Sequence, residues 1–250
     1  MKTFNALVLL ALTLPAFAVT APTRAPLDDM EKIRRFEAAF HTDSADPKAQ
    51  QKLKLMCFSL KQKSVPTLIK VMKEPNFTDK GRWHATMLLG QVMGKKSAPF
   101  IAKFSSHPSW MMRVASLKAL AALGMKDYQA VYAKALKDES LIVRVQALDN
   151  ITRMDLKPLA PQVWSMMYDQ SNYTGKAGQR RRTSIVRSII RTVGDLKYAK
   201  AQGPLNKLMQ KPKYQDLLED LDYSLEKISG KNSPTGNAAS TRAFWASAKI

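Results

Sequence analysis

The sequence is poor in residues that cross-link or hold metals. Cys57 is its only cysteine, so an intramolecular disulfide is excluded even in an oxidising compartment. It lies in the apolar run 53–58, where we expect a free thiol to pack in the core. The three histidines, His41, His84 and His107, are at least 23 residues apart, and none has a second ligand one helical turn away. We therefore expect no metal site and no cofactor, with His84 on an exposed helix face and His107 in a turn.

Catalytic motifs are also lacking. The chain contains no H-E-x-x-H or G-x-S-x-G motif, and its glycine-lysine pair at 175–178 lacks the spacing of a phosphate-binding loop. Acidic residues cluster near the C-terminus, but their spacing places Asp216, Glu219 and Asp220 along one helical ridge. We interpret that ridge as a water-facing surface and expect the protein not to be an enzyme.

Long hydrophobic runs are few, and the main one is N-terminal. Lys2 precedes an apolar run over 6–14, which is shorter than the ~20 residues that a bilayer span needs. Pro15 ends the run, and Ala16-Phe17-Ala18 has the small-x-small pattern of a signal peptidase site. We expect residues 1–18 to be a signal peptide cleaved after Ala18, which makes the mature protein periplasmic or secreted. The alternative is a retained N-terminal anchor.

Acidic residues are scarce relative to basic ones. The chain has 20 Asp and Glu against 40 Lys and Arg, a formal charge of +20. Such an excess attracts anions in general, including acidic proteins, anionic lipid, lipopolysaccharide and nucleic acid. Half of it is local, because eleven basic residues and one acid, Asp195, lie between Ser171 and Lys213.

This basic segment suggests a binding stripe. Arg180, Arg187 and Arg191 are separated by seven and four residues, so they would share one face of a helix. We predict that they bind an anionic partner on a concave surface, and the alternative is a solvated face that serves solubility. The predicted anion-binding residues are Lys176, Arg180, Arg181, Arg182, Arg187 and Arg191.

The remaining sequence is what a helical repeat would show. Almost no run alternates with period two, so an all-α fold is predicted. Ser64-Val65-Pro66 and Ser97-Ala98-Pro99 are 33 residues apart, and each has Ser as a helix N-cap followed by Pro in the first turn. A second helix then ends every 30 to 39 residues, which indicates an α-solenoid. Its expected ends are Gly94, Gly124, Asp155, Gly194 and Gly230.

Two segments make the resemblance more specific. Residues 138–151 (DESLIVRVQALDNI) resemble the inter-helix turn and second helix of a HEAT repeat, and residues 109–120 resemble them nearly as well. The resemblance covers about residues 64–230. It implies a right-handed α-solenoid of about five HEAT-like helix pairs, with second helices that line a concave binding face.

The same resemblance assigns a structural role to Arg113 and Arg144. It implies that each pairs with an acidic or carbonyl group of a neighbouring repeat. The first repeat departs from the motif with Trp83 at this position, the fourth departs with Thr183, and the fifth is acidic there.

Both ends differ from the repeats. We expect residues 19–63 to hold an entry segment and two N-terminal cap helices, and residues 231–250 to be a flexible tail. The tail begins like a linker, and residues 242–246 could form one helical turn. Phe244 and Trp245 have no core of their own there, so we expect them to dock onto the last repeat, or else onto a partner.

Together these features predict an exported HEAT-repeat binding or scaffold protein whose basic concave face holds an acidic protein or an envelope polyanion. The alternative is a HEAT-like protein that binds nucleic acid or excises bases. Predicted export and the lack of an assignable catalytic aspartate with flanking aromatics disfavour it. Bilin lyases also use HEAT-like units, but apart from the thiol of Cys57 nothing suggests tetrapyrrole chemistry.

Overall fold

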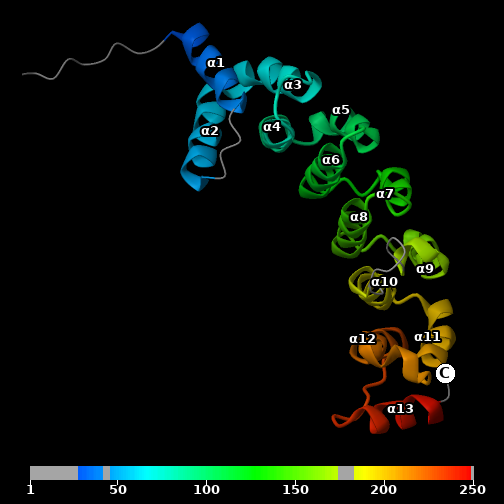
Figure 1. Cartoon of the computed structure of the whole chain (residues 1–250). Helices are drawn as coiled ribbons and strands as arrows, with labels where there is room; N and C mark the ends of the chain where they lie inside the picture. Colours follow the sequence, from blue (N-terminus) through cyan, green and yellow to red (C-terminus); the bar gives the residue numbers. More distant parts are fainter. Residues whose placement is uncertain (1–27, 42–45, 174–182, 249–250) are drawn as a thin grey trace, which may run out of the picture.

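The protein is an all-α solenoid. The computed structural model describes residues 28–41, 46–173 and 183–248, and these contain helices and no strand. Five helix pairs stack into an arc, with the second helix of each pair on the concave side (Figure 1). The pairs are α3 (Val65–Lys73) with α4 (Asp79–Met93), α5 (Ala98–Ala102) with α6 (Trp110–Ala122), α7 (Gln129–Ala135) with α8 (Leu141–Arg153), α9 (Ala160–Ser165) with α10 (Ser184–Asp195), and α11 (Gln202–Met209) with α12 (Leu218–Ser229).

Three more helices lie at the ends of the arc. Before the pairs come α1 (Asp29–Ala38) and α2 (Pro47–Leu60), and after them comes α13 (Ala238–Ser247). No helix in the described ranges has both the length and the apolar character of a membrane span. The predicted signal peptide lies outside the described residues.

A residue with a positive φ angle follows the second helix of every pair. Within the described part of the chain, positive φ angles occur at Lys61, Gly94, Gly124, Asp155, Lys197 and Gly230. After α6, α8 and α10, the residue that follows the positive-φ residue donates its backbone N–H to the carbonyl five residues earlier at 3.0 Å. This hydrogen bond is typical of a Schellman motif. The prediction that Gly194 ends its helix is therefore wrong, because α10 continues to Asp195 and turns at Lys197. The hydrogen bond that closes the helix holds Lys197 in this conformation, which glycine would adopt with less strain.

Ser64 and Ser97 do not cap the helices that follow them. Both are buried, and their hydroxyl groups donate backwards to the carbonyls of Lys61 and Gly94 at 2.6 and 2.7 Å. The equivalent serines therefore satisfy the partly buried carbonyls of the two positive-φ residues that precede these helices.

Gly194 has another role, at a close approach between helices. A Cβ atom there would lie 2.7 Å from the Cα atom of Ser224, so α10 and α12 meet backbone to backbone. At the other end of the arc, a Cβ on Gly81 would overlap the carbonyl oxygen of Phe40 in the cap. Only glycine fits at these two contacts.

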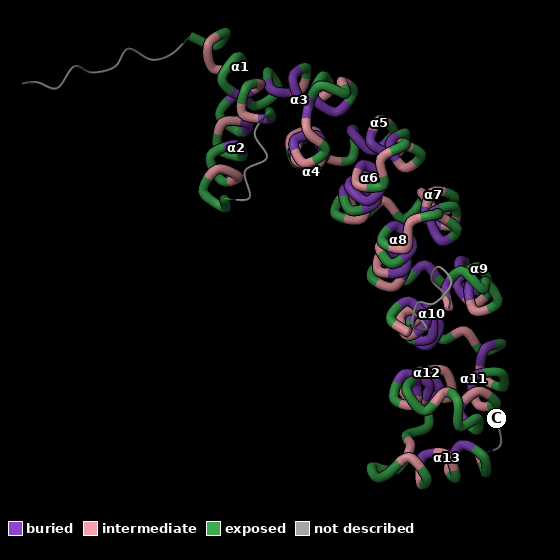
Figure 2. The backbone as a smooth tube through the Cα atoms, viewed as in Figure 1, coloured by how far each residue is buried: buried purple, intermediate pink, exposed green. Residues whose placement is uncertain are grey.

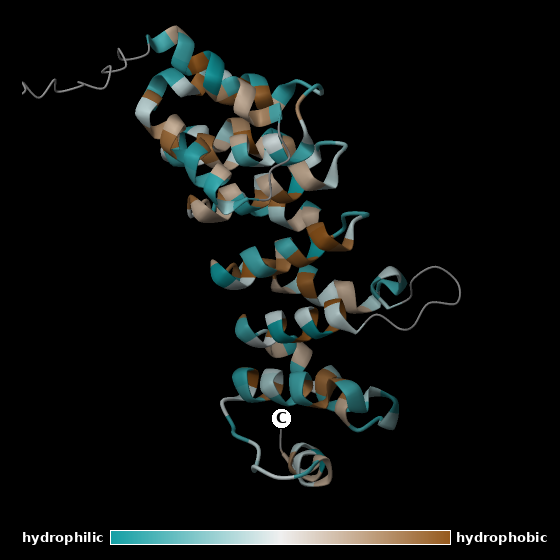
Figure 3. Cartoon of the chain, turned by 60° about the vertical axis from the view of Figure 1, so that its left-hand side comes forward, coloured by the Kyte–Doolittle hydropathy of each residue, from teal (hydrophilic) through white to brown (hydrophobic). Residues whose placement is uncertain are grey.

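One continuous apolar core lies between the two rows of helices, where the buried residues of both rows face each other (Figure 2). Apolar and polar residues alternate along the helices, as expected for helices that bury one face (Figure 3). Leu148 and Ile151 of α8 are 1% and 0% exposed. Cys57 is fully buried, and desolvation raises the pKa of its thiol. His84 is half-buried rather than exposed, because α2 packs beside α4, and this desolvation lowers its pKa.

The C-terminal helix is longer than the single turn expected from the sequence. The side chain of Asn237 caps it by accepting the N–H groups of Ala239 and Ser240, each at 3.0 Å. Trp245 is fully buried, and its indole N–H donates to Asp222 of α12 at 2.6 Å. Phe244 packs edge to face on Trp245, with ring centroids 4.9 Å apart. The structure thus places both aromatics where α13 covers the last helix pair.

Candidate functional site

Four successive second helices carry an arginine at their fourth residue. These arginines are Arg82 in α4, Arg113 in α6, Arg144 in α8 and Arg187 in α10. The identification of Trp83 and Thr183 as the motif positions is therefore wrong. In the first repeat, Trp83 comes directly after the arginine. In the fourth repeat, the long segment between α9 and α10 shifts the arginine away from the position expected from a fixed period. We call the four residues the arginine ladder.

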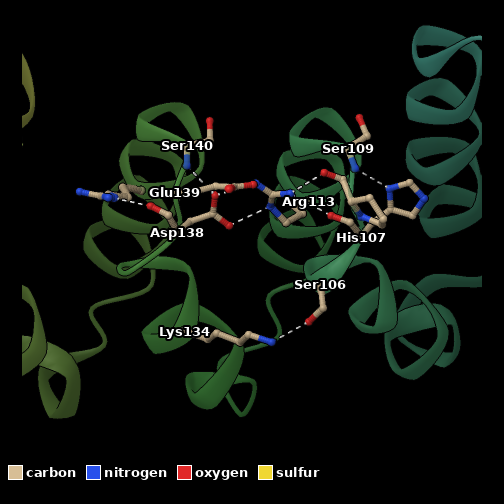
Figure 4. Close-up of polar contacts among 10 residues, drawn as sticks. Ser106, His107, Ser109, Arg113, Lys134, Asp138, Glu139 and Ser140 are labelled. Atoms are coloured by element: carbon tan, nitrogen blue, oxygen red, sulfur yellow. Dashed lines mark hydrogen bonds and ion pairs between the residues drawn. The ribbon is translucent and has the colours of Figure 1, made fainter. Parts of the chain in front are cut away.

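Arg113 joins two repeats (Figure 4). Its guanidinium donates to both carboxylate oxygens of Asp138, in the following pair, at 2.8 Å each. It also donates to the carbonyls of His107 and Pro108 at 2.9 and 2.8 Å, and to Glu139 at 3.2 Å. Only 8% of the Arg113 side chain is exposed, so most of it is buried in this contact between the two repeats.

Arg144 and Arg82 make the corresponding links. Arg144 donates to Ser171 and Asn172 of the fourth pair at 2.7 Å each, and to the carbonyl of Asp138. Arg82 donates to the carbonyl of Met72 at 3.2 Å, and its guanidinium lies 2.8 Å from Nε2 of His107. Burial lowers the pKa of His107, and the positive charge of Arg82 lowers it further. The backbone N–H of Ser109 donates to Nδ1 of the same ring at 3.0 Å, so both ring nitrogens face donors, and a neutral ring with one acceptor nitrogen suits this site better than a charged ring with none.

The predicted anion-binding stripe is only partly visible. Lys176, Arg180, Arg181 and Arg182 lie outside the described residues. Arg187 and Arg191 both face Asp220 of α12: Arg191 donates to its Oδ1 atom, and Arg187 lies 3.3 Å from its Oδ2 atom. The Arg191 guanidinium is also 4.9 Å from the ring centroid of Tyr223. Both arginines therefore serve the contact between α10 and α12.

The prediction that Asp220 faces water is wrong. Only 2% of its side chain is exposed, whereas Arg187 and Arg191 remain 42% and 47% exposed. The acidic ridge of α12 faces α10 at this point. A buried carboxylate that would be costly alone is compensated there by two cations.

Replacing Arg187 and Arg191 together by alanine is expected to lower the free energy of unfolding by about 1–3 kcal/mol, because the Asp220 carboxylate stays buried without its partners. Adding Asp220→Asn should restore part of the loss. Urea denaturation measures both effects. Arg153→Ala is the control, since Arg153 is 74% exposed and pairs with Asp149 of its own helix. A double variant as stable as the control would show that the pairing does not hold α12.

An apolar groove that was not predicted from the sequence lies on the concave face. It has a volume of about 590 Å³ and crosses α4, α6, α8 and the start of α10. Trp110, Ile142 and Val145 in its wall are 41%, 53% and 41% exposed. Within the described chain, its polar lining consists of Lys118, Gln146 and Ser184, and no acidic side chain lines it.

The register of the repeats explains the groove. The second and fifth residues of α6 and α8 flank the ladder arginine and line the groove. They are Met111 and Val114 in α6, and Ile142 and Val145 in α8. Apolar residues at both positions of two adjacent repeats were the sequence signal for this surface. It was readable only once the position of the arginine in each helix was known.

No group of three or more His, Cys, Asp or Glu side chains in the described ranges could hold a metal ion. No protein-family model and no curated protein matches the chain. Among solved structures, the complex of CpcE and CpcF of phycocyanin lyase from Nostoc sp. PCC7120 is similar at 13% identity and a TM-score of 0.42, over 94% of this chain and 99% of that one. A designed armadillo repeat protein is similar at 14% identity and a TM-score of 0.42, over 78% of this chain and 99% of its own. These similarities concern the helical fold alone.

Proposed function

We propose that the protein is an exported binding scaffold, and not an enzyme, which holds a protein partner on its concave face. The apolar groove carries this proposal, because Trp110, Ile142 and Val145 expose 41–53% of their surface side by side along it. Contiguous exposed apolar surface on a soluble protein commonly marks an interaction site. The arginine ladder supports it by fixing the helices from which the groove is built.

The chain's charge favours an acidic partner. Its formal charge is +20, and Lys118 is the charged side chain in the described lining of the groove. An envelope polyanion is the less favoured partner, because two arginines of the predicted anion-binding stripe, Arg187 and Arg191, already pair with Asp220. Export follows from the predicted signal peptide at 1–18 and remains part of the proposal.

Affinity capture from an envelope extract tests the site. The double variant Ile142→Asp/Val145→Asp places two carboxylates in the groove, and a partner that covers them would have to bury unpaired charge. We expect at least a tenfold loss of the proteins that the wild-type chain retains, in line with a penalty above about 1.4 kcal/mol.

Leu55→Asp is the matched control, because Leu55 is 59% exposed and lies on α2, outside the groove. It should retain the same proteins as the wild type. In urea denaturation, the free energies of unfolding of all three chains should agree within about 0.5 kcal/mol. Equal retention by the groove variant would remove the concave groove as the binding site.

A further inference from the structure

The lining of the groove restricts the conformation of whatever occupies it. Backbone N–H and C=O groups need partners when they are buried. The polar side chains of the described lining are Lys118, Gln146 and Ser184, and Gln146 already donates to Asp149 at 3.1 Å and to Asn150 at 2.9 Å. An extended peptide laid on this surface would turn backbone groups towards apolar walls without partners. A helix satisfies its own backbone, so it needs only an apolar stripe.

Spacing points the same way. Packed helices lie about 8–10 Å apart, and seven residues of an α-helix rise about 10.5 Å. Residues i and i+7 of a bound helix would therefore meet successive second helices. Same-face residues of a strand recur every ~6.6 Å, out of step with this repeat. The groove crosses four helices, from α4 to α10, so the matching helix has about 16–20 residues.

The charges near the groove favour an acidic flank on that helix. Lys118 lies 5.8 Å from the ring centroid of Trp83 at one wall. Lys80 occupies, in α4, the register position that Met111 and Ile142 hold in α6 and α8. The carboxylates of α4 and α8 lie beside cations of their own helices: Asp79 is 3.5 Å from Arg82, and Asp149 is 2.8 Å from Arg153.

We propose that the groove binds an amphipathic helix of a partner protein. Its apolar stripe lies against Trp110, Ile142 and Val145, and acidic residues flank the stripe beside Lys118. This inference rests on the proposed function and adds the conformation and charge of the bound segment.

Three labelled peptides of about 18 residues test it by fluorescence anisotropy. The first carries Leu at i, i+3, i+4 and i+7 with Glu at its flanks, the second has the same composition in scrambled order, and the third has Lys in place of Glu. We expect the first to bind at least tenfold more tightly than the others and to gain helical circular dichroism on binding. Ile142→Asp/Val145→Asp should abolish binding, and Leu55→Asp should preserve it. Lys118→Glu should weaken the binding of the Glu peptide and strengthen the binding of the Lys peptide.

The outcomes separate the two proposals. If the scrambled peptide binds the groove as tightly as the first peptide, the bound segment need not be an amphipathic helix, and only the proposed binding scaffold is retained. Failure of all three peptides, together with groove-dependent capture from the envelope extract, would have the same meaning. Equal binding of the Glu and Lys peptides would overturn the acidic flank. If neither peptides nor extract proteins depend on the groove, both proposals fail.

Discussion

Arg113→Ala is expected to lower the free energy of unfolding by about 3–5 kcal/mol, the range seen when one partner of a buried ion pair is removed. Arg113 is 8% exposed, and the carboxylate of Asp138 is 11% exposed. The substitution leaves that carboxylate and the carbonyls of His107 and Pro108 without their main donor. Urea denaturation monitored by circular dichroism measures the loss.

Arg113→Lys tests whether geometry or charge matters. An ammonium group cannot reach, at once, the acceptors that the planar guanidinium bridges, so we expect most of the loss to remain. Glu139→Ala is the control, because its side chain is 84% exposed and its bond to Arg113 is a surface contact. If Arg113→Ala changes stability by less than about 0.5 kcal/mol, the ladder does not hold the repeats together.

Leu148→Ala is expected to cost about 2–5 kcal/mol through the cavity it leaves in the core. Leu148 is 1% exposed on α8. Ile142→Ala on the same helix is the matched control, since Ile142 is 53% exposed in the groove, and it should change stability by about 0.5 kcal/mol or less. The same urea experiment compares them. Equal losses would mean that the core and groove faces of α8 are not the ones described.

The helices were predictable because each buries a periodic apolar face, as Leu148 and Ile151 show. The ladder register was harder to predict. Arg113 and Arg144 are 31 residues apart, but Arg144 and Arg187 are 43 apart, so a fixed period misses the fourth repeat. The partner of an arginine lies in another repeat, and the distance along the chain does not identify it.

The groove and Asp220 could not be predicted for a related reason. Ile142 and Val145 stand among core residues of an apolar helix, and only the stacking of its neighbours leaves them exposed. Asp220 has the spacing of a solvated ridge, yet its cation Arg191 lies 29 residues earlier in the sequence. Side-chain exposure depends here on packing between repeats, which local periodicity does not encode.

The glycine contacts at Gly81 and Gly194 bear on the elasticity of the arc. At both, one backbone rests directly against another segment, so neither junction can tighten further. Between them, α6 and α8 are joined by side-chain links such as the bond from Asn150 to the carbonyl of Leu117 at 2.9 Å. Side chains change rotamer at less cost than contacting backbones can shift. Bending is therefore expected to concentrate at α6 and α8, so that a change in curvature alters the width of the groove while the two ends move as stiff units.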